Sequence, residues 1–148
     1  IAQERTEKEG LVEKIRFLLI DIGTPWEYRD NSFDAAFDGT TFINLTTTAE
    51  TTNYLQELKR TLKNHAFGML VTPVLPDKFY QKLYDEQRSN PVICPSGISQ
   101  RVYTEEQVVS LLREYFVLQD ITKIRKKNKM YGREYGRYLM RIIFQNEK

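Results

Sequence analysis

Apolar and polar residues follow one another along the chain in blocks that predict short buried strands separated by helices. EKIRFLLIDIG (13–23) has a central apolar block without a polar face, which is typical of a buried parallel strand. FDAAFD (33–38) and AFGMLVTPV (66–74) predict two more strands. The polar stretch 1–10, with Gly10 as its C-cap, predicts the end of a helix before them.

Three later segments combine helical spacing of apolar residues with signals for helix ends. The segment 46–63 is the longest, and Thr47 and Glu50 at its start fit a capping box that satisfies two free N–H groups. The segments 77–88 and 104–115 predict two more helices, and the second also begins with a capping-box pattern.

Two apolar segments near the end, FVLQDITKI (116–124) and RYLMRIIFQ (137–145), predict strands joined by a hairpin or a longer antiparallel connection. The expected element order is therefore α–β–β–α–β–α–α–β–β. Alternating strands and helices predict an α/β fold with a parallel sheet and helices on its faces. The last pair adds an antiparallel strand at one edge, which mixed sheets allow.

Composition narrows the classes of partner and site. The 148 residues suit one domain, and 22 Lys and Arg against 20 Asp and Glu give a net charge of +2, too balanced to favour nucleic acid or an anionic membrane. A single cysteine, Cys94, and a single histidine, His65, leave little material for a metal site or a catalytic triad. We therefore expect no metal, no membrane span and a reducing, cytoplasmic location. The basic run 123–129 could contact RNA, but a solvated hairpin tip is the favoured interpretation.

Four segments in order carry a family resemblance: DIG, DNSFDAAFD, YLQELKRTLKNHAFGMLVTP and YTEEQVVSLLREYFVLQDI. Together they resemble the C-terminal two-thirds or so of the class I S-adenosylmethionine-dependent methyltransferases of the small-molecule, methyltransferase-11-like type. The resemblance implies a Rossmann-like sheet that ends in an antiparallel hairpin. It also implies that 1–148 is one methyltransferase domain, incomplete at its N-terminus, because strands 1 and 2 and the glycine-rich loop of the family are missing from this sequence. The missing part either belongs to a longer protein or comes from another chain, or else the fold is rearranged. The sheet edge left open could also support self-association.

The resemblance implies S-adenosylmethionine as cofactor and a set of residues that contact it. Asp21 matches the family carboxylate that accepts from the adenine amino group, and Ile22 matches the residue that packs on the adenine ring. Asp38 and Gly39 lie at the carboxyl end of a strand, where open α/β sheets bind ligands, and the backbone there approaches the methionine part. Phe42 is added as a candidate aromatic contact by its position alone.

Other residues are assigned by position. Trp26, Tyr80 and Tyr103 are candidates for binding a small-molecule substrate, whereas the resemblance gives Asp30 and Asp34 structural roles. No catalytic residue is identified. This suits methyl transfer from a sulfonium by in-line displacement, since the sulfur departs neutral and positioning alone supplies much of the rate. The alternative function is a non-catalytic methyltransferase-like subunit that binds a protein partner.

Overall fold

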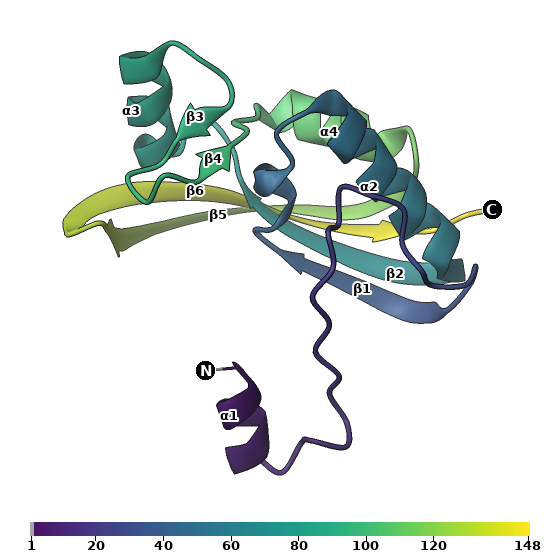
Figure 1. Cartoon of the computed structure of the whole chain (residues 1–148). Coiled ribbons are helices and arrows are strands. Elements are labelled where there is room, and N and C mark those ends of the chain that lie inside the picture. The colour runs from purple at the N-terminus through teal and green to yellow at the C-terminus, as the bar shows by residue number, and fades with distance from the viewer. Residues whose placement is uncertain (1) are drawn as a thin grey trace.

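The computed structural model describes residues 2–148, and its centre is a four-stranded mixed sheet (Figure 1). The helices are α1 (Ala2–Lys8), the 3-10 turn η1 (Phe42–Asn44), α2 (Thr48–Thr61), α3 (Lys78–Gln87) and α4 (Glu105–Arg113). The strands are β1 (Phe33–Gly39), β2 (Leu62–Pro73), β3 (Val92–Ile93), β4 (Ser99–Gln100), β5 (Val117–Met130) and β6 (Arg133–Gln145). β3 and β4 form a separate antiparallel pair.

The strand order in the sheet is β1-β2-β6-β5. β1 and β2 are parallel, whereas β6 runs antiparallel to both β2 and β5. This order confirms the predicted parallel unit followed by a terminal antiparallel hairpin. Among residues 2–148 no strand pairs with the outer edge of β1, so β1 is an edge strand.

The terminal hairpin is longer than the sequence predicts. β5 and β6 stay paired up to Met130 and Arg133, and only Tyr131 and Gly132 form the turn. Both turn residues have positive φ, 48° and 81°, as tight two-residue hairpin turns require. The residues expected to form a connection therefore extend the two strands.

The predicted strand within 13–23 is wrong. The structure gives this segment no strand, and Leu19 is fully exposed, with Phe17, Leu18 and Ile20 each more than two-fifths exposed. Figure 1 shows the chain crossing from α1 to the sheet as an extended linker. An apolar run becomes a buried strand only beside a neighbouring strand, and the described residues supply none here.

The boundary between α2 and β2 also differs from the prediction. β2 begins at Leu62, so Asn64 and His65 lie in the strand rather than in a turn before it. His65 has a φ of 63°, and its N–H donates to the Asn146 carbonyl. The buried Asn146 side chain also donates to the Leu62 carbonyl at 2.9 Å. This contact from the far end of the chain bridges the end of α2 and the start of β2.

Helices cover one face of the sheet. Figure 1 shows α2, α3 and α4 on this face, with α1 lying apart on the other side. The core lies between these helices and the sheet and includes Leu55, Leu58, Leu70, Val108, Leu112, Ile142 and Phe144. On the opposite face Phe37 is 68% exposed and Phe67 is 50% exposed. The expectation of helices on both faces is therefore wrong for the described residues.

The predicted helix starts are confirmed. Thr47 accepts from the Glu50 N–H while Glu50 accepts from the Thr47 N–H, and Thr104 and Gln107 form the same reciprocal pair before α4. Asp77 caps α3 by accepting from two N–H groups of its first turn. These caps fix where each helix begins over the sheet.

Candidate functional site

Two cavities share the segment 38–43, where the chain leaves the carboxyl end of β1, as part of their lining. The first, which we call the apolar cavity, holds about 310 Å³ between β1, α2 and the loop 20–28. The second, which we call the tyrosine–arginine pocket, holds about 340 Å³ between α3, the β3–β4 pair and the β5–β6 hairpin. Asp38 and Thr41 line the first cavity and Thr40 lines the second. The carboxyl end of β1 therefore faces both cavities.

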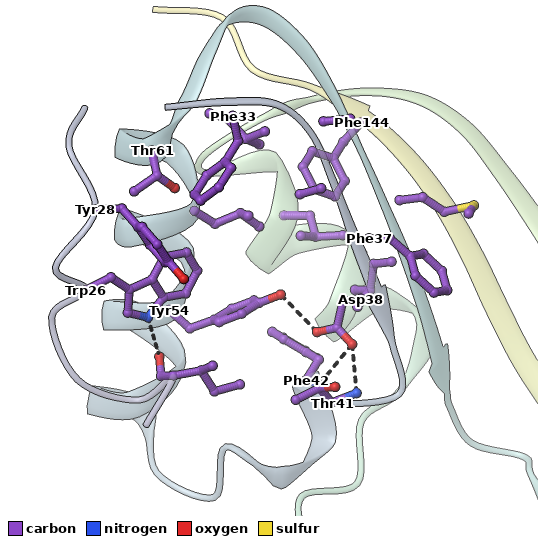
Figure 2. A pocket seen from close by; sticks show the side chains of 18 of the residues that line it. Trp26, Tyr28, Phe33, Phe37, Asp38, Thr41, Phe42, Tyr54, Thr61 and Phe144 are labelled. Carbon is purple, nitrogen blue, oxygen red and sulfur yellow. Dashed lines mark hydrogen bonds between the residues drawn. The ribbon is translucent and has the colours of Figure 1, made fainter. Parts of the chain in front are cut away.

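Asp38 is the buried carboxylate of the apolar cavity. It is 8% exposed, and Oδ1 accepts from the Thr41 N–H at 2.7 Å and from the Phe42 N–H at 3.4 Å. Its Oδ2 accepts from the Tyr54 hydroxyl at 2.9 Å (Figure 2). Burial raises the pKa of Asp38, and these hydrogen bonds oppose that rise. The cavity thus holds one negative group among apolar and aromatic side chains.

We expect Asp38→Asn to stabilise the protein by about 1 kcal/mol at neutral pH, because it removes a charge that burial disfavours while Asn can keep the same partners. Because the pKa of Asp38 is raised in the folded state, the folded protein holds the carboxyl proton more tightly than the unfolded chain does. The free energy of unfolding of the wild type therefore falls as the pH rises above the ordinary carboxyl range. The gain should therefore vanish at pH 3 and grow toward pH 7, as urea unfolding at several pH values would show. Asp34→Asn, on the same strand but exposed, is the control. A gain that is constant with pH would contradict the assignment.

The outer wall of the apolar cavity is fixed by α2. Arg60 donates to the Trp26 carbonyl at 3.0 Å and the Tyr28 carbonyl at 2.8 Å, while Glu57 accepts from the Trp26 N–H at 2.9 Å. Arg60 also pairs with Asp30 at 2.6 Å. Asp34 pairs with Lys63, again at 2.6 Å. Asp30 and Asp34 therefore each form an ion pair at the surface, and neither lines either cavity.

Three of the five residues expected to bind the cofactor line the apolar cavity: Ile22, Asp38 and Phe42. Asp21 lies outside it in an exposed turn, where its Oδ1 accepts from the Gly23 N–H at 2.9 Å. Gly39 is exposed at the end of β1 and lines neither cavity. The structure thus brings part of the expected set together.

The three residues expected to bind substrate lie in different places. Trp26 lines the apolar cavity, and its indole N–H donates to the Ile22 carbonyl at 3.2 Å (Figure 2). Tyr80 lines the tyrosine–arginine pocket. Tyr103 is buried and stacks on Phe42, with ring centroids 5.2 Å apart, so it supports the cavity wall from behind.

Sequence reasoning missed three polar residues of these cavities. The spacing of Tyr54 marks it only as part of the apolar face of the helix predicted at 46–63, although its hydroxyl donates to Asp38. Arg137 and Gln100 line the tyrosine–arginine pocket and were not singled out. The available signal for Arg137 was a cation at the start of an otherwise apolar strand. Nothing local marks Gln100.

Two further properties concern the described part of the chain. Within residues 2–148 no group of three or more His, Cys, Asp or Glu side chains is arranged to hold a metal ion. No helix in the same range has both the length and the apolar character needed to cross a membrane.

Comparison with known proteins identifies the fold. Scans against protein-family models and against curated proteins give no match. Among solved structures, a SAM-dependent methyltransferase from Methanosarcina mazei superposes with a TM-score of 0.79 at 21% identity, over 99% of this chain and 76% of that one. A putative methyltransferase from Bacillus halodurans gives 0.74 at 13% identity, over 99% and 78%.

A third structure contains bound ligands. It is the 1,6-didemethyltoxoflavin-N1-methyltransferase of Burkholderia thailandensis with bound 1,6-didemethyltoxoflavin and S-adenosylhomocysteine. It superposes with a TM-score of 0.66 at 13% identity, over 99% of this chain and 56% of that one. Each likeness extends along nearly the whole of this chain and over part of the other. The parallel β1–β2 pair, the antiparallel hairpin and these superpositions show that the chain has the fold of the class I S-adenosylmethionine-dependent methyltransferases.

Proposed function

We propose that this protein takes part in S-adenosylmethionine-dependent methyl transfer to a small-molecule acceptor. One observation carries the proposal: in a methyltransferase fold, the segment 38–42 at the carboxyl end of β1 borders both an apolar cavity and a pocket with polar walls. Open α/β sheets bind ligands at this end of their strands. The two cavities suit the cofactor and the acceptor, respectively.

The residues of the apolar cavity fit the proposed cofactor. Ile22, Trp26 and Phe42 offer apolar and aromatic faces for a nucleoside, and Asp38 adds a negative group for a cation. S-adenosylmethionine supplies a methyl group on a positively charged sulfur. Aromatic faces stabilise such a cation by about 0.5–2 kcal/mol. Asp21, at the edge of the same loop, is proposed to accept from the adenine amino group.

The protein's own contribution to the reaction is then mainly positioning. An in-line displacement needs the acceptor atom aligned with the methyl group, and alignment supplies roughly 7–11 kcal/mol of the barrier reduction. The walls support this role because Arg60 and Glu57 fix the loop that carries Trp26. Tyr80 would contact the acceptor from the other pocket. No side chain is assigned as a general base.

We further propose that the cofactor site is completed by a segment that pairs with the open edge of β1. The unpaired edge, the exposed Phe37 and Phe67, and the exposed apolar run 17–20 support this proposal. The segment would come from a longer protein or from a second chain, including a second copy. Residues 1–148 would then be part of one methyltransferase domain.

Three observations bear on partners and location. Two cations of the basic run are paired: Lys123 with Glu105 at 2.6 Å and Lys127 with Glu134 at 3.5 Å. Such pairing disfavours an RNA-binding role for the run.

Cys94 is a buried free thiol, which suits the cytoplasm. A formed pocket on the acceptor side favours an enzyme over a subunit that only binds a protein partner.

Calorimetric titration with S-adenosylhomocysteine tests this function. We expect the chain alone to bind about a hundred-fold more weakly than a form that carries the natural sequence upstream of Ile1, since several cofactor hydrogen bonds would be restored. A mutant of the longer form, with Trp26→Ala, should lose affinity as well. Equal affinity of the two forms would contradict the proposed completion, and no binding by either would contradict the proposed function.

A further inference from the structure

The lining of the tyrosine–arginine pocket combines two cations with several neutral polar side chains. Its charged lining residues are Lys126 and Arg137, both positive, and the described lining residues include no carboxylate. The neutral polar wall contains Tyr80, Cys94 and Gln100. Tyr131 at the tip of the β5–β6 hairpin adds an aromatic edge.

Arg137 is held rigidly from behind. It is 8% exposed, and its Nε donates to Oδ2 of Asp77, which is fully buried, at 2.7 Å. The same carboxylate oxygen accepts from the Tyr138 N–H at 2.8 Å. The guanidinium also lies 5.8 Å from the Phe79 ring centroid and 5.6 Å from that of Tyr80. These contacts fix its orientation before any ligand arrives.

The outer nitrogens of Arg137 are poorly used by the protein. Nη1 donates to the Met130 sulfur at 3.1 Å, and a thioether is a weak acceptor. Nη2 has no hydrogen bond to the described residues. A guanidinium presents its N–H donors in a planar fork that matches the two oxygens of a carboxylate. Arg137 therefore has unused donors at the pocket, which the exposed Lys126 also lines.

The pocket lining also contains neutral hydrogen-bonding groups. Oε1 of Gln100 accepts from the Tyr80 hydroxyl at 2.7 Å and from the Cys94 thiol at 3.0 Å. Burial raises the pKa of both Tyr80 and Cys94, so these groups stay protonated at neutral pH. The pocket consequently keeps its positive charge under physiological conditions.

We propose that the methyl acceptor is a small carboxylate, whose anionic group binds to Arg137 and Lys126 in the tyrosine–arginine pocket. This inference rests on the proposed function, which it deepens by naming the substrate class. A volume of about 340 Å³ lies within the range of small-molecule sites. A purely structural Arg137 would account for the Asp77 pair, but not for the second cation and the polar wall that face the same space.

The test is an NMR titration of the chain with 4-hydroxybenzoate and with its neutral isostere 4-hydroxybenzamide, without cofactor. We expect the carboxylate to bind at least about ten-fold more tightly than the amide. Its binding should shift the Arg137 Nε–H and Gln100 side-chain resonances. Equal affinities, or shifts confined to other regions, would overturn the proposal. If phenyl phosphate binds more tightly than 4-hydroxybenzoate, the pocket recognises a phosphate rather than a carboxylate, and this result would also overturn the proposal.

Two variants sharpen the titration. Lys126→Gln leaves the Asp77–Arg137 pair untouched and should weaken 4-hydroxybenzoate about three- to ten-fold, with little effect on the amide. Lys129→Gln, on the same exposed stretch of β5 but outside the pocket, is the matched control. If both variants lose the same affinity for 4-hydroxybenzoate, the anion is attracted by the general positive charge of β5 rather than by a site at Lys126, and the proposed site is overturned.

This titration and the calorimetric one can fail separately. Carboxylate binding is measured without cofactor, so it reports on the tyrosine–arginine pocket alone. If S-adenosylhomocysteine binds but the protein binds 4-hydroxybenzoate no more tightly than 4-hydroxybenzamide, the proposed substrate class is wrong and the proposed methyl transfer stands. If the carboxylate binds as expected but S-adenosylhomocysteine binds neither form, the proposed function fails.

Discussion

Asp77→Ala should destabilise the fold by about 3–5 kcal/mol, because it leaves Arg137 as a buried charge without its partner. Arg137 is 8% exposed and Asp77 is fully buried. The substitution also removes the cap of α3, since Oδ1 of Asp77 accepts from the Phe79 and Tyr80 N–H groups at 3.1 and 3.3 Å. Urea unfolding followed by circular dichroism measures the loss.

Asp85→Ala on the same helix is the matched control. Asp85 is exposed and accepts a hydrogen bond from Gln81, so its loss should cost under about 0.5 kcal/mol. Replacing both members of the buried pair, in Asp77→Asn with Arg137→Gln, should recover part of the stability that Asp77→Ala loses. A loss under 1 kcal/mol for Asp77→Ala would show that the pair does not organise this region.

Gly68→Ala should be nearly as damaging. Gly68 on β2 lies opposite Phe144 on β6, and an added Cβ would lie 2.1 Å from Cζ of the Phe144 ring. That ring is buried and packs on Phe116, with centroids 4.4 Å apart. Overpacking of a core typically costs 1–3 kcal/mol, and we expect about 3 kcal/mol here because a contact of 2.1 Å forces the ring to move. Thermal unfolding by calorimetry measures the change.

Gly136→Ala gives the comparison for this effect. A Cβ at Gly136 would meet only Cγ of Lys78, at an ordinary 3.6 Å, so stability should change by under about 0.5 kcal/mol. Phe144→Leu should relieve the crowding and make Gly68→Ala less costly in the double variant than alone. If the stability changes of the two substitutions simply add in the double variant, the overlap between the added Cβ and the Phe144 ring is not the cause of the loss.

Local signals in the sequence were sufficient for the elements that build the scaffold. Thr47 with Glu50 and Thr104 with Gln107 predicted where α2 and α4 begin, because a capping box is a contact within one helical turn. The alternation of apolar runs and helices predicted the parallel β1–β2 pair. The apolar run 17–20 misled the prediction, because strand formation depends on a neighbouring strand that local sequence does not show.

The chemistry of the two cavities depends on contacts between distant residues. Arg137 meets Asp77 across 60 positions of the chain. Tyr54 reaches Asp38 from a different element. Such pairs follow from how the helices lie on the sheet rather than from spacing. Ile22, Asp38 and Phe42, three of the residues expected from the sequence to contact the cofactor, line one cavity in the structure, but the residues that position them emerged only from the structure.

The central claim is that the apolar cavity beside the carboxyl end of β1 accepts the nucleoside of the cofactor, and NMR mapping of S-adenosylhomocysteine tests it most directly. Trp26 is the one tryptophan, so its indole N–H, which donates to the Ile22 carbonyl, gives a single reporter signal. We predict that millimolar ligand shifts this signal and the amides of Asp38, Thr41 and Phe42. Shifts confined to the tyrosine–arginine pocket or the hairpin tip, with the indole signal unmoved, would contradict the account.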